Sequence, residues 1–148
     1  MDDLVILKAQ EAFARRLRGS SDVSENTRNS QAIAKAWRAA VDALDPDRYR
    51  IEVLVAPEFD QRIDVLDQSS RTAYEFKVSG KGSHAEFYKD VVKVLLWNRR
   101  RKERIARLVF ITEEEWGRKH LDTPMLREYV RYLAENGLQA KIAYVRHL

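Results

Sequence analysis

Cysteine is absent from the 148-residue sequence, and histidine is scarce. The absence of thiols excludes disulfide scaffolds, cysteine-ligated zinc and thiol nucleophiles, and it favours an intracellular location, for which we take the cytoplasm as the expectation. The three histidines, at positions 84, 120 and 147, are too few and too scattered to indicate a histidine-based zinc site. These observations exclude thiol chemistry and give no indication of a histidine-based zinc site.

Long apolar runs are also missing. No segment approaches the roughly 18 consecutive apolar residues that a membrane-spanning helix needs. The start of the chain, Met1-Asp2-Asp3, is acidic and lacks the basic beginning of a secretory signal. Glycine-rich nucleotide-binding loops and a Ser-His-Asp pattern are absent as well, which makes another class of hydrolase or transferase a poor fit. We expect a protein without a membrane partner.

The chain does contain charge, and enough apolar residues for one core. Hydrophobic residues make up 45% of the sequence and charged residues 34%, and 148 residues is the size of a single domain. The formal net charge is +4. A mildly basic balance favours polyanionic partners by electrostatic steering, although many unrelated proteins share it.

Hydrophobic periodicity and turn residues predict the order helix, helix, three strands, helix, strand, helix, strand. The expected helices span residues 4–18, 30–44, 83–101 and 123–135; the expected strands span 49–55, 62–67, 72–78, 108–112 and 139–145. This order indicates an α/β fold, a single domain over 1–148 with a mixed five-stranded sheet flanked by helices. Residues 1–29 would form an N-terminal helical extension and loop, with an apolar stripe for either a dimer contact or core packing.

The second and third predicted strands carry the residues that point to chemistry. If residues 68–71 form the turn between them, Asp64 lies directly across from Glu75. Side chains alternate along a strand, so Asp64, Glu75 and Lys77 share one face. The other face is then apolar and comprises Ile63, Val65, Tyr74, Phe76 and Val78.

Opposed carboxylates repel each other, and their pKa values rise unless a cation lies between them. Mg²⁺ prefers such an oxygen-only environment and keeps several waters. A lysine two residues after Glu75, on the same face, can contact a metal-bound water or a phosphate oxygen. The pattern therefore predicts a Mg²⁺ or Mn²⁺ site of Asp64 and Glu75 with Lys77 as catalytic partner. The alternative is a cross-strand salt-bridge ladder on a solvated face, although Asp64 opposite Glu75 places like charges together.

This arrangement resembles the PD-(D/E)XK nuclease superfamily, which has the restriction endonuclease-like fold. Asp64 is followed after ten residues by Glu75-Phe76-Lys77, and the element order over about residues 30–145 is similar to that family's core. The motif's opening proline is replaced by Ile63. The resemblance implies metal binding by Asp64, Glu75 and the main-chain carbonyl of Phe76, and catalysis by Lys77.

Further site residues follow from the same resemblance. Many members of the family have one more acidic ligand ahead of the meander, for which Glu25 is the first candidate, with Glu11 and Glu52 as weaker ones. A polar residue from the helix after the motif often joins the site or the substrate. In this chain three residues fit that role: His84, Tyr88 and Lys89.

The resemblance also implies DNA as the substrate, hydrolysed with the help of Mg²⁺ or Mn²⁺. Lys81, between two glycines, adds a cationic approach to the site. The basic cluster at 99–104, with Arg99, Arg100 and Arg101, is either a solvated helix end that suits the helix dipole or a set of phosphate contacts.

The sequence leaves both the oligomeric state and the catalytic activity open. If both DNA strands are cut, a homodimer is the simplest arrangement, and sequence specificity can reside on a separate partner protein. The alternative function is a non-catalytic nucleic-acid-binding or protein-interaction module with a nuclease-like fold. The tryptophans at 37, 97 and 116 are expected to pack in the core or at its edge.

Overall fold

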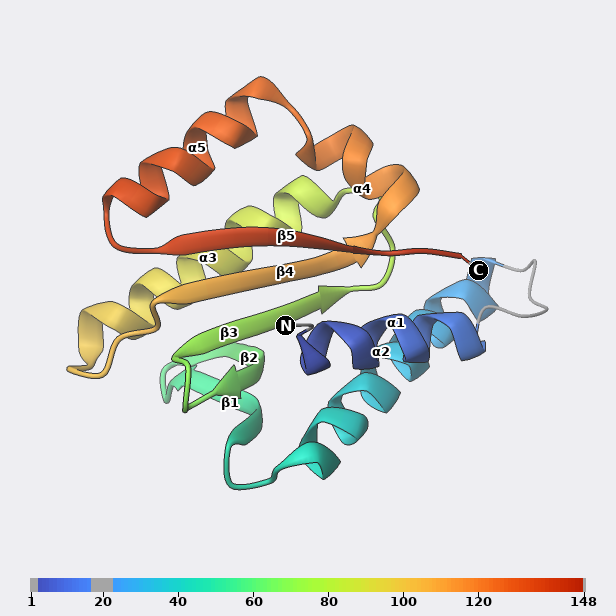
Figure 1. Ribbon diagram of the computed structural model, residues 1–148, viewed down its shortest axis with the longest axis horizontal. Helices are drawn as coiled ribbons and strands as arrows, with labels where there is room; N and C mark the ends of the chain where they lie inside the picture. Colours follow the sequence, from blue (N-terminus) through green and yellow to red (C-terminus); the bar gives the residue numbers. More distant parts are fainter. Residues whose placement is uncertain (1–2, 17–22, 148) are drawn as a thin grey trace.

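The computed structural model describes residues 3–16 and 23–147 (Figure 1). Its centre is a five-stranded sheet in the order β1-β2-β3-β4-β5. The strands are β1 (Tyr49–Ala56), β2 (Phe59–Asp67), β3 (Thr72–Lys77), β4 (Arg107–Glu113) and β5 (Gln139–Val145). The first three strands are antiparallel neighbours, whereas β3, β4 and β5 run parallel. The predicted α/β class and the meander followed by crossovers are confirmed.

Helices cover both faces of this sheet. They are α1 (Leu4–Arg16), α2 (Val23–Leu44), α3 (Ser83–Arg100), α4 (Glu114–Leu121) and α5 (Pro124–Glu135). One core lies under α1 and α2 and includes Tyr74 and Phe76, while a second core lies under α3, α4 and α5 and includes Ala73 and Phe110. In the view of Figure 1, α3 passes behind the strands. None of the described helices has the length and apolarity that crossing a bilayer requires.

Two helix predictions need correction. α2 begins at Val23, whereas the expected helix began at residue 30, so the last part of the expected N-terminal extension is helical from residue 23 onward. Residues 17–22 lie outside the described part of the chain. A separate helix, α4, also follows β4 directly, at a place where no helix was expected. The side chain of Glu113 caps it by accepting a hydrogen bond from the N–H of Trp116 at 3.0 Å. Glutamate is not a usual N-cap residue, so the start of α4 carried no signal.

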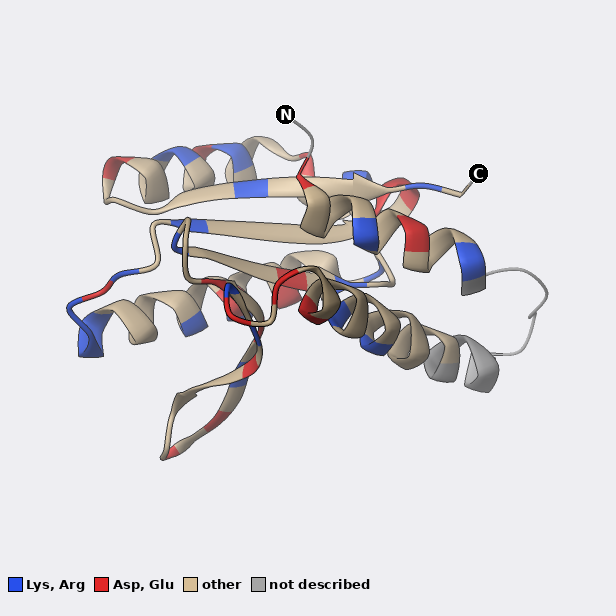
Figure 2. Ribbon diagram, turned by 60° about the horizontal axis from the view of Figure 1, so that its bottom comes forward, with Lys and Arg blue, Asp and Glu red and all other residues tan. Residues whose placement is uncertain are grey.

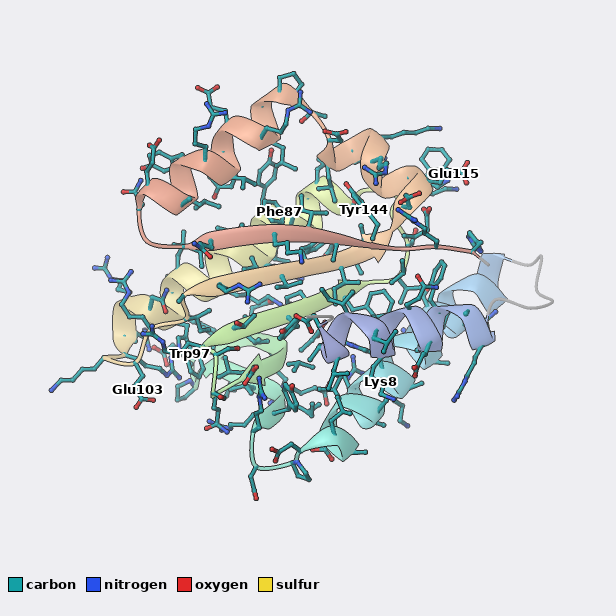
Figure 3. The ribbon with its side chains drawn as sticks, viewed as in Figure 1. Lys8, Phe87, Trp97, Glu103, Glu115 and Tyr144 are labelled. Carbon is teal, nitrogen blue, oxygen red and sulfur yellow. The ribbon has the colours of Figure 1, made fainter. Side chains whose placement is uncertain are left out.

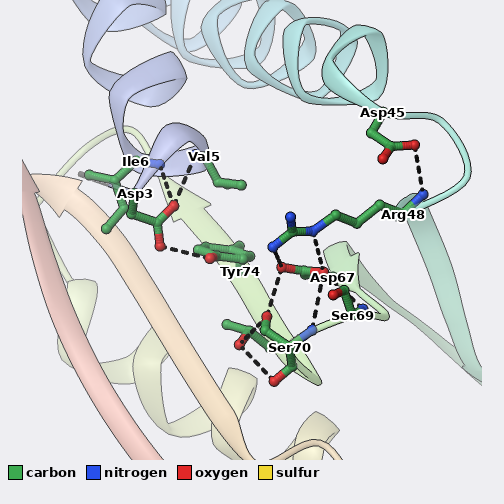
Figure 4. Close-up of polar contacts among 10 residues, drawn as sticks. Asp3, Val5, Ile6, Asp45, Arg48, Asp67, Ser69, Ser70 and Tyr74 are labelled. Carbon is green, nitrogen blue, oxygen red and sulfur yellow. Dashed lines mark hydrogen bonds and ion pairs between the residues drawn. The ribbon is translucent and has the colours of Figure 1, made fainter. Parts of the chain in front are cut away.

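The first helix is part of the core. Val5, Ala9 and Phe13 are buried, and the indole N–H of Trp37 donates to the carbonyl oxygen of Val5 at 3.0 Å. Asp3 ties the beginning of α1 to the sheet, because its carboxylate accepts from the N–H of Val5 at 2.9 Å and from the hydroxyl of Tyr74 at 2.7 Å (Figure 4). Of the two roles expected for this helix, core packing is the one observed.

The turn between β2 and β3 is held by Asp67 (Figure 4). Its buried carboxylate accepts hydrogen bonds from Nε of Arg48 at 3.0 Å and from the hydroxyl of Ser70 at 2.7 Å. Asp67 pairs with Thr72, so the predicted turn over 68–71 and its register are confirmed. The site depends on this register.

The β1–β2 hairpin exchanges faces at Glu52. Before this point Ile51 pairs with Val65, and both pack against the core under α1 and α2; beyond it Val53 pairs with Ile63, and both belong to the core under α3. Glu52 has a φ of 51°, a left-handed conformation that interrupts the alternation of side chains. The prediction that Ile63 shares a face with Val65 is therefore wrong. Past the exchange, the hairpin bends away from the sheet (Figure 2).

Candidate active site

Asp64 and Glu75 take over the contact between β2 and β3 where backbone pairing ends. Regular pairing stops at Val65 and Tyr74. One residue further, the N–H of Asp64 donates to Oε1 of Glu75 at 2.7 Å, and the N–H of Phe76 donates to Oδ2 of Asp64 at 3.1 Å. Each carboxylate thus accepts a hydrogen bond from the opposite strand. The two acidic residues meet at one level of the hairpin, as the sequence predicted.

Glu75 does not lie on a solvated face. Its exposure is 3%, because α3 covers this side of the sheet. Oε2 of Glu75 is 2.6 Å from Nζ of Lys93, and the same ammonium is 2.9 Å from Oδ1 of Asp90 and 2.8 Å from the carbonyl oxygen of Arg62. The expected contrast between an apolar face and an open charged face is therefore wrong. The alternative of a solvated salt-bridge ladder fails for the same reason.

Asp90 and Lys93 are site residues that the sequence analysis missed. Both are buried on α3, among the apolar residues Phe87, Val91 and Val94. A charged residue in the apolar stripe of a helix needs a buried partner, because an unpaired buried charge is very costly. The interruption of this stripe by Asp90 was the available signal.

The ionisable groups around Glu75 shift one another's pKa values. Burial raises the pKa of Glu75 well above its ordinary value, repulsion from Asp64 and Asp90 adds to the rise, and Lys93 opposes it. Burial also raises the pKa values of Asp64 and Asp90. Burial alone would lower the pKa of Lys93, but attraction to Glu75 and Asp90 outweighs it, so this pKa is raised as well. Perturbed groups gathered in this way are typical of functional sites.

Lys77 ends β3 and is partly buried beside the centre. It lies level with Thr112 of β4, and among the described residues it takes part in no ion pair. A groove of about 390 Å³ lies between the β1–β2 hairpin and α3, and its lining includes Phe59, Lys89 and Lys93. Lys93 is the residue that this groove shares with the ion network around Glu75.

The sequence offers three candidates for an additional acidic metal ligand: Glu25, Glu11 and Glu52. The side chain of Glu25 lies outside the described part of the structure. Glu11 forms an ion pair with Lys8 on α1, at 3.3 Å. The register of β1 with β2 puts Glu52 level with Asp64. The negative charge of Glu52 contributes to the raised pKa of Asp64. In the described ranges, no group of three or more His, Asp or Glu side chains is assembled closely enough to hold a metal.

Five of the seven predicted nucleic-acid-binding residues divide between the two ends of α3. At its beginning, Nζ of Lys81 lies 5.0 Å from the ring centre of Trp116, and His84 stacks on His120 with ring centres 5.0 Å apart. Nζ of Lys119 lies over the same indole, at 4.4 Å. Trp116 is 37% exposed, so the packing role expected for it is wrong. At this end, two ammonium groups therefore lie within 5.0 Å of the ring centre of one exposed indole.

At the other end of α3 the arginines have different surroundings. Arg99 is exposed, and Arg100 pairs with Glu58. The guanidinium of Arg101 lies 3.4 Å from the ring centre of Trp97. Arg99 lies fifteen residues after His84 in the helix, which corresponds to roughly 22 Å. These five predicted residues thus form two separate regions.

Two further predicted residues lie along the middle of the helix. Lys89 is exposed and lines the groove beside Lys93. Tyr88 packs at the edge of the core, with its ring centre 5.6 Å from that of Tyr129. Lys89 is therefore the one of this pair that faces the groove.

Comparisons of the chain with models of known protein families, with curated proteins and with solved structures give no match. The function therefore has to be argued from the chemistry of the site itself.

Proposed function

We propose that the chain is a metal-dependent nuclease that hydrolyses phosphodiester bonds in DNA. The observation that carries this proposal is the meeting of Asp64 and Glu75 across adjacent strands, with Lys77 two residues further along β3. Buried carboxylates cost free energy unless they are compensated, so their concentration at one point of the hairpin calls for a functional reason. Hydrolysis assisted by a hard cation supplies that reason.

The surrounding architecture supports the same proposal. A helix, three meandering strands, a helix over the meander and a strand parallel to β3 frame the site. This is the order by which the chain resembles the PD-(D/E)XK superfamily, so a restriction endonuclease-like core forms part of the proposal.

The donor atoms fit Mg²⁺ or Mn²⁺. Asp64 and Glu75 offer carboxylate oxygens, and Mg²⁺ commonly uses one or two carboxylates and keeps several waters, so three assembled acids are not required. The N–H of Phe76 points at Asp64. In a strand the N–H and C=O of one residue point to the same side, so the carbonyl oxygen of Phe76 also faces Asp64. We place Glu52 ahead of Glu25 as the additional ligand, since its charge already acts on Asp64.

Each residue then has a definite role. A bound metal would polarise the phosphate and lower the pKa of a coordinated water. Lys77 would orient the attacking water or neutralise charge that develops on the phosphate. Lys93 positions Glu75: it binds Oε2, while Oε1 stays on the Asp64 side.

The test is cleavage of plasmid, single-stranded and branched DNA with Mg²⁺ or Mn²⁺. We expect Glu75→Gln and Lys77→Met to lose orders of magnitude in rate while the circular dichroism spectrum is preserved. Glu128→Gln removes an exposed carboxylate on α5 and is the matched control. Cleavage by Glu75→Gln at the wild-type rate would refute the assignment.

A second candidate is a non-catalytic nucleic-acid-binding module. It is favoured by one observation: the ammonium of Lys93 pairs with both Glu75 and Asp90, so these carboxylates already have a cationic partner within the protein. Calorimetric titration with Mg²⁺ and Mn²⁺ separates the two candidates. Heat of binding that is lost in Glu75→Gln supports the nuclease, whereas binding of DNA without binding of either metal supports the module.

A further inference from the structure

A second cavity, of about 360 Å³, lies outside the Asp64–Glu75 centre, at the end of α3 that carries the arginines. Four arginines line it: Arg50, Arg71, Arg101 and Arg104. Among its lining residues Glu103 is the single acidic one, and the remainder of the wall is mainly apolar. Trp97 and Glu103 mark this end of the molecule in Figure 3. The cavity thus combines an apolar wall with an excess of positive charge.

The fold explains how these arginines meet. Arg50 of β1 pairs with Leu66 of β2, and Leu66 pairs with Ala73 of β3, so they form one row across the sheet. Leu66 and Ala73 belong to the core under α3, which places the row on that face. Arg101 directly follows α3 and stacks on Trp97. A strand, a turn and a helix end therefore contribute guanidinium groups to the same cavity.

These guanidinium groups lack acceptors within the described part of the chain. Nη1 of Arg101 is buried and has no hydrogen-bond partner there. Burial, together with the charges of Arg100 and Arg50, lowers the pKa of Arg101. A buried cationic N–H without an acceptor costs free energy, and the cost disappears when an anion accepts its hydrogen bond.

The backbone at Arg71 gives an independent indication. Its φ is 54°, in the left-handed region where glycine or asparagine is expected. The carbonyl of Arg71 accepts hydrogen bonds from the N–H groups of Ala106 and Arg107, which fixes this conformation. An arginine held at a strained position beside a basic cavity suggests that its side chain is needed there.

We infer that this cavity binds a phosphate group through the guanidinium groups of Arg50, Arg71, Arg101 and Arg104. The planar fork of arginine matches two phosphate oxygens, and phosphate forms strong charge-assisted hydrogen bonds with it. The phosphate belongs either to a nucleic acid or to a small phosphorylated molecule. The inference does not depend on the proposed nuclease activity, because the cavity shares no lining residue with the Asp64–Glu75 centre.

The test is calorimetric titration in EDTA, which prevents metal-dependent cleavage. The titrants are inorganic phosphate, a 5′-phosphorylated oligonucleotide and the same oligonucleotide with a 5′-hydroxyl, all at constant ionic strength. Arg71→Asn is the sharpest variant, because asparagine suits the left-handed backbone while the charge is removed. We expect it to be at least as stable as the wild type and to bind phosphate at least about tenfold more weakly.

Arg131→Gln, an exposed arginine on α5 outside the cavity, is the control for loss of one charge. Weaker binding in Arg71→Asn and Arg101→Gln, but not in Arg131→Gln, supports the inference for whichever titrant shows it. Tighter binding of the 5′-phosphorylated oligonucleotide than of the 5′-hydroxyl one identifies a terminal phosphate as the ligand. If the arginine variants lose affinity equally for both oligonucleotides, the ligand is an internal phosphate. Binding of inorganic phosphate alone identifies a small phosphorylated ligand. Equal affinities of wild type and Arg71→Asn for all three titrants would overturn the inference.

Discussion

Lys93 is the only cation that the described residues place between Glu75 and Asp90, and all three side chains are buried. Removal of one partner from a buried ion network leaves uncompensated charge, which typically costs about 3–5 kcal/mol. We therefore expect Lys93→Met to lower the free energy of unfolding by an amount in this range, measured by urea denaturation at pH 7. Lys89→Met, one turn earlier and exposed, is the control and should change stability little.

The same ion network predicts that a second substitution can restore part of the stability lost in Lys93→Met. If the loss in Lys93→Met arises from the uncompensated charge of Glu75, the double variant Lys93→Met/Glu75→Gln should recover part of the lost stability. A double variant whose loss equals the sum of the two single losses would contradict this explanation. It would mean that Lys93 contributes mainly through the packing of its aliphatic chain.

Asp67 gives a prediction for pH dependence. Burial would raise the pKa of Asp67, but hydrogen bonds from Arg48 and Ser70 outweigh it and hold this pKa below its ordinary value of 3.8. A lowered pKa means that the stabilisation is complete above 3.8 and is lost as the pH falls through the lower, folded-state value. We expect Asp67→Asn to be less stable than wild type at pH 7 by about 1–3 kcal/mol.

This difference should shrink when urea unfolding is repeated at pH values below 3.8, where the carboxylate of the wild type becomes protonated. A difference that stays constant from neutral to strongly acidic pH would show that the charge of Asp67 is not what holds the turn.

At the scale of elements, the bend in β1 connects stability with the proposed site. Glu52 adopts a left-handed conformation, which costs a residue with a Cβ roughly 1–2 kcal/mol. Asparagine tolerates this conformation better, so we expect Glu52→Asn to gain up to about 1 kcal/mol in urea unfolding. Glu52→Gln, the matched control, removes the charge and keeps the strain.

If Glu52 is the additional metal ligand, both variants should bind Mn²⁺ more weakly than wild type in calorimetry, and only Glu52→Asn should gain stability. Wild-type affinity for Mn²⁺ in both variants would return the role of additional ligand to Glu25. A stability of Glu52→Asn below that of Glu52→Gln would refute the explanation of the bend.

Apart from α4, the order of the elements was predictable from the sequence because periodicity and turn residues act locally. The register of β2 with β3 followed from the polar turn over 68–71, which Asp67 holds. The exchange of faces at Glu52 could not be foreseen, since a left-handed residue is expected to be glycine or asparagine and here is a glutamate. For this reason Ile63 was assigned to the wrong core.

Of the candidate site, only the part on the β2–β3 hairpin was predictable from the sequence. Asp64 and Glu75 could be paired from alternation within two neighbouring strands. Asp90 and Lys93 come from a helix after the hairpin, and their contact with Glu75 depends on the packing of α3 over the sheet. Sequence periodicity indicates that a helix has a buried face, but it does not say which strand residue that face will meet.

At the scale of the whole molecule, α3 carries cationic groups at both ends. Lys81 lies just before it, beside the exposed Trp116, and Arg99 lies in its last turn. Eighteen residues at the helical rise correspond to roughly 27 Å, which is about eight base pairs of B-form DNA. The two ends are thus far enough apart to contact different phosphates of one bound duplex.

If the chain binds DNA as proposed, this arrangement predicts how salt should affect the affinity. Each phosphate contact contributes about 0.9 to the slope of log affinity against log salt concentration. Measured in EDTA, we expect Lys81→Gln and Arg99→Gln each to lower the magnitude of the slope by about one, and the double variant by about two. Arg131→Gln on α5 should leave the slope unchanged. If only one of the two variants changes the slope, the duplex contacts only one end of α3, which contradicts simultaneous contact with both ends.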